Sequence, residues 1–129
     1  MAGTLVANTI NTDTGLFTTN NAYLGIAKAW VNFQGGNGNT AGTINSSFNV
    51  SSITVVGTGQ YTVNFTTAMP NANFVTVVAG RIDYSGSFDN SFGGLSRVQP
   101  TTTTTQVVYQ TTSGAGTNAR EMDVLVISS

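Results

Sequence analysis

The chain has 129 residues, four of them Lys or Arg and five Asp or Glu, and it contains no His and no Cys. Without imidazole or thiol groups, it has no Cys or Ser-His nucleophile, no Cys/His zinc site, no histidine pH switch and no disulfide framework. Charged residues make up 7% of the chain, against about 25% in an average soluble domain, so uncharged polar residues must cover the surface.

The length of the chain fits a single domain with a hydrophobic core. Its net charge of −1 and its mean hydropathy of +0.07 differ from the composition of disordered chains, so we expect it to fold. A nearly neutral surface provides little repulsion between copies. The composition therefore favours a chain that self-associates or packs into an assembly.

Nucleic acids, membranes and cofactors are not among the predicted partners. The cations are dispersed and form no basic stripe that could neutralise phosphates: they are Lys28, Arg81, Arg97 and Arg120. No run approaches the roughly 18 apolar residues of a membrane span, and the N-terminus lacks the features of a signal peptide. Gly36-x-Gly38-x-x-Ala41 formally matches a dinucleotide fingerprint, but no predicted helix follows it to bind a pyrophosphate.

Hydrophobic residues recur with a period of two along the chain, whereas helical spacing is hard to find, so the sequence predicts an all-β protein. Residues 1–25 are polar with isolated apolar residues and are predicted to be an N-terminal arm or attachment segment. A β-sandwich domain is predicted for residues 26–129. In its first strand, the odd-numbered residues of Ala27–Phe33 share one face, and Trp30 lies on the other.

A bulge is predicted where the alternation changes register. Phe48 and Val50 alternate in even register, whereas Ile53 and Val55 alternate in odd register. Because a shift of one residue moves every side chain to the other face of a strand, Ser51-Ser52 must absorb the slip as a bulge or bend.

The clearest predicted hairpin joins Ile53–Val56 to Gln60–Thr66 through Gly57-Thr58-Gly59. Glycine suits such a link because tight hairpin turns need residues with positive φ. In the second strand of this hairpin, the odd-numbered residues of Tyr61–Phe65 are apolar and the even-numbered ones polar, so we expect one buried face.

The later strands follow a turn at Met69–Ala72. Phe74–Tyr84 is apolar on both faces, so we expect it to be covered twice, in part by another subunit. Thr101–Gln110 and Arg120–Ile127 are predicted to be the last two strands, and the five-threonine run Thr101–Thr105 is predicted to be an exposed or edge strand rather than a linker. About eight strands at this spacing predict an antiparallel, jelly-roll-like β-sandwich.

Three consecutive stretches carry a resemblance to a known family. They read AKAWVNF at 27–33, SFNVSSIT at 47–54 and GTGQYTVNFTTAMPNANF at 57–74. In this order they resemble a domain that recurs at the C-terminal ends of bacteriophage tail fibres and related virion appendages. The resemblance covers residues 27–80 and implies a β-rich, trimeric and non-enzymatic protein. It also assigns five aromatic residues to the fold: Trp30, Phe33, Phe48, Tyr61 and Phe65.

The resemblance implies a structural and adhesive role in a virion. The first hypothesis is a tail-fibre or receptor-binding domain, a homotrimer that contacts other phage virion proteins and a host surface glycan or protein. The alternative is a capsid decoration, or cement, protein that clamps coat subunits through apolar contacts and the N-terminal arm. The third hypothesis is a carbohydrate-degrading appendage of the virion.

The candidate ligand-binding stretch is Arg81–Arg97, which concentrates charged and aromatic residues among Gly and Ser. Glycan sites combine an aromatic face for sugar C–H groups with carboxylate and amide hydrogen bonds, and these residue types coincide here. The alternative is that Phe88 and Phe92 pack as a small satellite core or a subunit contact. The candidate residues are Arg81, Asp83, Tyr84, Phe88, Asp89, Asn90, Phe92 and Arg97.

Paired carboxylates are the remaining catalytic device, and Glu121 and Asp123 lie two residues apart on one strand face. No apolar pocket that would raise one pKa is visible in the sequence, and adjacent Arg120 suggests an ion pair, so no catalytic residue is predicted. Asp83 and Asp89 share a loop without EF-hand spacing, so no metal site is predicted either.

Trp30 is predicted to pack in the core, as a single Trp inside the resembling stretch usually does. The alternative is that Trp30, beside Lys28 on one strand face, stacks on a ligand or a cation.

Overall fold

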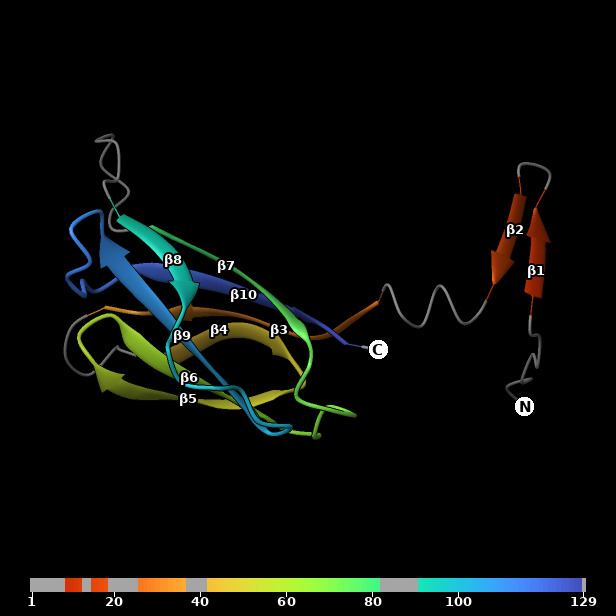
Figure 1. Ribbon diagram of the computed structural model, residues 1–129, viewed down its shortest axis with the longest axis horizontal. Helices are drawn as coiled ribbons and strands as arrows, with labels where there is room; N and C mark the ends of the chain where they lie inside the picture. The colour runs from red at the N-terminus through yellow and green to blue at the C-terminus, as the bar shows by residue number, and fades with distance from the viewer. Residues whose placement is uncertain (1–8, 13–14, 19–25, 37–41, 82–90, 129) are drawn as a thin grey trace.

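A computed structural model describes the chain in residues 9–12, 15–18, 26–36, 42–81 and 91–128. Every regular element in these ranges is a β-strand, and two antiparallel four-stranded sheets form a sandwich (Figure 1). The prediction of an all-β fold with antiparallel sheets is therefore confirmed. Within the same ranges, no helix has the length and hydropathy to cross a membrane.

Sheet I has the strand order β4-β3-β10-β7, and sheet II has the order β5-β6-β9-β8. The strands of sheet I are β3 (Ala27–Gln34), β4 (Thr43–Phe48), β7 (Val75–Arg81) and β10 (Glu121–Ile127). Those of sheet II are β5 (Val50–Gly57), β6 (Gln60–Phe65), β8 (Ser91–Leu95) and β9 (Thr104–Thr111). The edge strands β7 and β8 pack beside each other, which closes one side of the sandwich.

Two short strands precede the sandwich, in the segment predicted to be an arm. They are β1 (Thr9–Thr12) and β2 (Gly15–Thr18), which pair antiparallel as a hairpin. Figure 1 draws this hairpin apart from the two sheets. The sandwich begins with β3 at Ala27, next to the boundary expected from the composition of the chain.

The core lies between the sheets and is built from alternate residues of the inner strands. The buried face predicted for β6 is confirmed, and Tyr61 packs edge-on against Phe33 with ring centroids 5.3 Å apart. Burying each large apolar side chain contributes about 1.5–3 kcal/mol, which favours this alternation over any other register. The core residues include Ala29, Val31, Phe33, Tyr61, Val63, Phe65, Val107, Tyr109, Met122, Val124 and Val126.

The chain passes from sheet I to sheet II at Asn49, which has a φ of 55°. Asn tolerates this left-handed conformation better than most residues. Its side chain donates to the carbonyls of Lys28 and Thr67 and accepts from the Thr67 amide at 2.7 Å. These bonds tie the crossing point to both neighbouring segments, so β4 and β5 run in different sheets without an intervening loop.

The predicted bulge is confirmed directly after this crossing. Val50 pairs with Phe65 and Ser52 pairs with Asn64, which leaves Ser51 as the extra residue. The bulge restores the register that the alternation of hydrophobic residues required.

The predicted hairpin between β5 and β6 is also confirmed, and it turns at Gly59, whose φ is 66°. A Cβ atom on Gly59 would lie 2.3 Å from the Tyr109 carbonyl oxygen and 2.4 Å from that of Thr117. The Gly59 amide donates to Asn118 Oδ1 at 3.1 Å. The turn is therefore enclosed by backbone from the other end of the chain.

The prediction for the five-threonine run Thr101–Thr105 was correct in part: Thr101–Thr103 are exposed but precede the strand, and the strand that follows is not an edge strand. β9 lies between β6 and β8, and Thr105 is buried. The strand begins at Thr104 because Thr101 Oγ1 accepts from the amides of Thr103 and Thr104, a local turn that competes with strand pairing. A threonine-rich composition favours a strand but does not determine its place in the sheet.

Replacing Tyr61 by Phe should change the alkaline stability of the protein. The Tyr61 hydroxyl donates to the Gly35 carbonyl, and burial raises its pKa from 10.0, with a hydrogen bond to the Ala119 backbone acting in the opposite direction. Because the unfolded chain ionises first, this residue stabilises the fold fully below pH 10 and less as pH rises through the folded-state pKa.

At pH 7, we expect the free energy of unfolding of Tyr61→Phe to be about 1 kcal/mol below that of the wild type, because the variant lacks the hydrogen bond of the Tyr61 hydroxyl. Above pH 10, we expect the wild type to lose stability with rising pH more steeply than the variant, which has no phenol at this position to ionise. Urea denaturation of both proteins between pH 7 and pH 11 measures this difference. Parallel stability curves over that range would contradict the role given to the Tyr61 hydroxyl.

Candidate functional site

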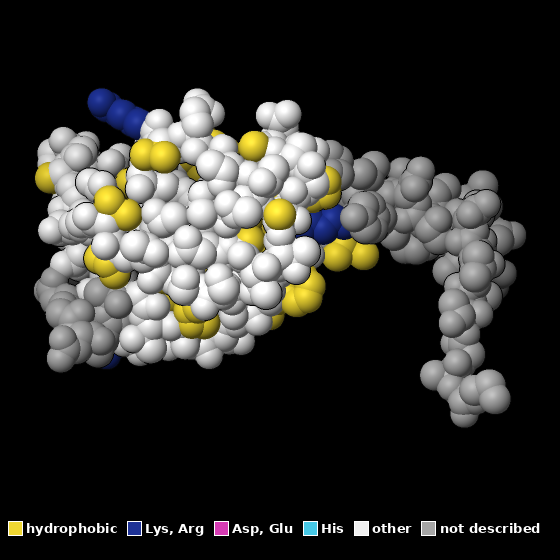
Figure 2. Space-filling view, turned by 90° about the horizontal axis from the view of Figure 1, so that it is seen from below, with side chains coloured by type: hydrophobic (Ala, Val, Ile, Leu, Met, Phe, Trp, Pro, Cys, Tyr) yellow, Lys and Arg dark blue, Asp and Glu magenta, His cyan; other side chains and the backbone are white. Residues whose placement is uncertain are grey.

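The outer faces of the two sheets differ in composition. Sheet II presents uncharged polar side chains such as Thr54, Thr62 and Asn64. Figure 2, viewed from the side on which β5 and β6 lie, shows scattered hydrophobic side chains and no acidic side chain. Exposed large hydrophobic side chains also occur on sheet II, at Val55, Val56, Phe92 and Leu95, but on the outer face of sheet I they lie beside carboxylates. The outer face of sheet I is therefore the candidate site.

Hydrophobic side chains from all four strands of sheet I form one continuous row, which we call the apolar row. Trp30 pairs with Phe48 on one side and with Leu125 on the other, and Leu125 pairs with Val77. All four side chains are exposed, Trp30 by 38% and Val77 by 52%. Since neighbouring strands lie about 4.8 Å apart, the row extends for about 15 Å across the sheet.

A chain of hydrogen bonds crosses the same face beside the apolar row, and we call it the polar ladder. Asn32 Nδ2 donates to Glu121 Oε1 and to Asp123 Oδ1, each at 2.7 Å. Asn45 Nδ2 donates to Asn32 Oδ1 at 2.7 Å, and Arg81 forms an ion pair with Glu121 Oε2 at 2.6 Å. The ladder thus fixes both carboxylates and joins the four strands.

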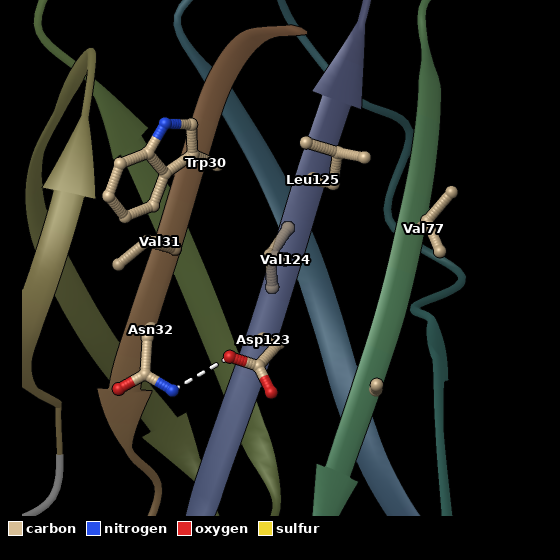
Figure 3. Close-up of a pocket in the computed structure, with 8 residues that line it drawn as sticks. Trp30, Val31, Asn32, Val77, Asp123, Val124 and Leu125 are labelled. Carbon is tan, nitrogen blue, oxygen red and sulfur yellow. Dashed lines mark hydrogen bonds between the residues drawn. The ribbon is translucent and has the colours of Figure 1, made fainter.

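A hollow of about 300 Å³ lies between the apolar row and the polar ladder. Figure 3 shows Trp30, Leu125 and Val77 on neighbouring strands, with Asn32 and Asp123 turned toward each other below them. Ala79, opposite Asp123 on β7, is small and leaves this space open. The lining residues are Trp30, Val31, Asn32, Val77, Ala79, Asp123, Val124 and Leu125.

The prediction that Trp30 packs in the core was wrong. Its neighbours Ala29 and Val31 are buried, so the alternation of β3 directs Trp30 to the outer face, together with Asn32. Phe48, also assigned to the fold by the resemblance, is exposed on the same face. The position of Trp30 fits the alternative stated from the sequence, in which this side chain stacks on a ligand.

The stretch predicted from the sequence as a ligand site is described only in part, because Asp83, Tyr84, Phe88, Asp89 and Asn90 lie outside the described residues. Of its other members, Arg81 ends β7 and contributes to the polar ladder on sheet I.

Phe92 lies on β8 of sheet II, where it pairs with Gln110 and is exposed. Arg97 follows β8 and borders a groove with Leu95 and Val98. The described members of the stretch therefore lie on two different sheets, and the stretch as one site stays a prediction.

Glu121 and Asp123 share a strand face, as predicted. Both accept from the same amide of Asn32, a residue about 90 positions away in the sequence. No spacing rule could have associated Asn32 with these carboxylates, because the link depends on the pairing of β3 with β10. Within the described ranges, no cluster of three or more His, Cys, Asp or Glu side chains could hold a metal ion.

The outer face of sheet I therefore offers an exposed indole ring, a fixed carboxylate and an amide around one hollow. Such a face can bind a ligand by stacking, by hydrogen bonds and by burial of apolar surface. Comparisons of this chain with protein-family models, with curated protein sequences and with solved structures find no match.

Proposed function

We propose that this chain is a non-enzymatic structural and adhesive protein of a bacteriophage virion, a tail-fibre or receptor-binding domain that attaches to the host surface. Its contact surface is the outer face of sheet I. The resemblance of residues 27–80 to tail-fibre domains and the β-sandwich fold support this proposal. The observation that carries it is the exposed apolar row, since contiguous apolar patches on a folded protein mark interaction sites.

The polar ladder supports a non-enzymatic role. A glycosidase needs one carboxyl group in apolar surroundings that keep it protonated as the general acid. Glu121 instead lies against the Arg81 guanidinium, and Asn32 donates to both Glu121 and Asp123. The two carboxylates thus act as hydrogen-bond acceptors that hold the sheet together and present polar atoms to a ligand.

In the proposed homotrimer, the subunits meet along the side on which β7 and β8 lie. These strands are the edges of their sheets and pack beside each other, so one neighbouring surface could cover both. Val75 on β7, Leu95 on β8 and Val98 just after it are all exposed. A neighbouring subunit would cover these three side chains, which the single chain leaves open.

The position of the protein on the particle tests the proposed role. Electron microscopy of phage particles that carry a labelled chain should place it on the tail. Labels in many copies around the capsid would overturn the tail assignment and favour the decoration alternative, in which the apolar row clamps coat subunits. Sedimentation of the purified chain should give the mass of a trimer, and a stable folded monomer would contradict the proposed assembly.

Binding to host cells should depend on Trp30. We expect Trp30→Ala to reduce the binding of purified protein to host cells at least about tenfold, because aromatic residues at the centre of a contact contribute most of its affinity. Phe92→Ala tests the stretch predicted from the sequence, and Val56→Ala, an exposed residue on the opposite edge, is the control. If Trp30→Ala binds host cells as well as the wild type does and Phe92→Ala binds them more weakly, the contact site lies on sheet II and not on sheet I.

A further inference from the structure

We infer that the hollow beside Trp30 binds a single neutral pyranose ring that carries an N-acetyl group. This inference rests on the proposed function, because it names the class of ligand that the same face would take. Four observations support it: the exposure of Trp30, the fixed polar pair beside it, the apolar wall opposite, and the charge of the hollow.

Trp30 provides the stacking surface. Its side chain is 38% exposed and belongs to β3, an inner strand of sheet I, so its neighbours hold it from both sides. The face of an indole ring carries partial negative charge, and the C–H groups on one side of a pyranose are apolar with partial positive charge. These two surfaces match in size and carry opposite partial charges, so they attract each other.

Asp123 and Asn32 provide the hydrogen bonds. Asp123 Oδ1 accepts from Asn32 at 2.7 Å, which fixes the direction of the carboxylate without exhausting its acceptor capacity. Sugar hydroxyl groups and an amide N–H are donors, and hydrogen bonds to a carboxylate are about twice as strong as those between neutral groups. Because Asn32 is itself held by Asn45, the polar pair is already in place before a ligand arrives.

The opposite wall of the hollow is apolar and favours an acetyl methyl group. It is formed by Val77, Ala79 and Leu125, beside the carboxylate of Asp123. An N-acetyl substituent offers an N–H donor next to a methyl group, which fits this arrangement. The volume of about 300 Å³ lies at the small end of ligand pockets, which range from about 300 to 1,000 Å³, so the hollow suits one ring.

The charge of the hollow disfavours acidic sugars. Asp123 is the charged residue in its lining, and Glu121 stands next to it in the polar ladder. Lys28 shares the face of β3 with Trp30 but follows the strand away from Asn32 and does not line the hollow. The guanidinium of Arg81 is already paired with Glu121. A uronic acid would therefore place its carboxylate near another one, and like charges at such distances repel each other.

Trp30 is the single tryptophan of the chain, so its fluorescence reports on the hollow directly. Titration of the purified protein with N-acetylglucosamine should give a saturable change in emission, with a Kd on the order of 1 mM for so small a ligand. Glucose should bind at least about tenfold more weakly, and glucuronic acid should give no saturable change. Glucuronic acid binding as well as N-acetylglucosamine would overturn the inference.

Two variants separate binding from folding. Ala79→Leu fills the hollow from an exposed position on the edge strand, and Asp123→Asn keeps the size of the side chain but removes its charge. We expect both to retain the circular dichroism of the wild type and to lose the response to N-acetylglucosamine. Thr54→Ala on sheet II is the matched control and should respond as the wild type does. Retention of the full response by Ala79→Leu would place the ligand elsewhere.

The failures of the two proposals are distinguishable. If no sugar changes the emission but Trp30→Ala still abolishes binding to host cells, the proposed function stands and the inference about the ligand is overturned. If the emission changes with protein concentration alone, a second copy of the chain covers Trp30, and the inference is likewise overturned. If Trp30→Ala and Ala79→Leu both bind host cells as well as the wild type does, the proposed contact face itself is overturned.

Discussion

Replacing Gly59 by alanine should lower the free energy of unfolding by more than about 3 kcal/mol. Gly59 has a φ of 66°, and this left-handed conformation costs a residue with a side chain about 1–2 kcal/mol. The new methyl group would also lie 2.3 Å from the Tyr109 carbonyl and 2.4 Å from the Thr117 carbonyl. Both contacts are to backbone, which cannot rotate away as a side chain can, so the turn and its neighbours must move.

Gly114→Ala is the matched control for this prediction. Gly114 has a φ of 81°, but no atom lies within 4 Å of the position of its missing Cβ. Gly114→Ala should therefore lose only the cost of the left-handed conformation, about 1–2 kcal/mol. Urea denaturation followed by circular dichroism measures both variants, and equal losses would show that the backbone contacts of Gly59 contribute nothing.

Replacing Asn32 by aspartate should have the second largest effect, a loss of about 2–4 kcal/mol at pH 7. The substitution removes the donor that Glu121 and Asp123 share and places a third carboxylate at 2.7 Å from each of them. Repulsion raises the folded-state pKa of the new carboxyl above its unfolded value. Its contribution to stability is therefore fully present below the unfolded pKa, about 3.9, and is lost as pH rises through the folded-state pKa.

The pH dependence distinguishes this mechanism from a simple loss of hydrogen bonds. The difference in stability between Asn32→Asp and the wild type should shrink as pH falls from 7 toward 4. Asn64→Asp is the control, because Asn64 on sheet II donates to Ser52 and Thr54, which carry no charge. A deficit in Asn32→Asp that is independent of pH would refute the repulsion between carboxylates.

Much of the fold could be predicted from the sequence because the alternation of side chains is a local signal. The buried face of β6, the bulge at Ser51 and the turn at Gly59 each follow from residues within a few positions of one another. Each feature also has one dominant cause, either the burial of every second residue or the need for a positive φ.

The candidate site could not be predicted in the same way, because it depends on which strands become neighbours. Alternation divides β3 into two faces, but only the strand order shows that the face with Trp30 is left uncovered. The same strand order brings Asn32 to Asp123. The position of β9 in the middle of sheet II was missed for the same reason, since composition does not determine strand order.

In the proposed function, the domain binds through one of its two outer faces, the face of sheet I. A domain with two such faces would cross-link neighbouring copies. The strands of sheet II carry no carboxylate, and uncharged polar groups such as Thr62 and Asn64 lie among their exposed hydrophobic side chains. A one-sided domain can instead be displayed in several copies that all face outward. Weak sites displayed together bind with an avidity that can exceed the single-site affinity by about 10²–10⁴. Attachment would then be reversible for one copy and stable for the whole particle.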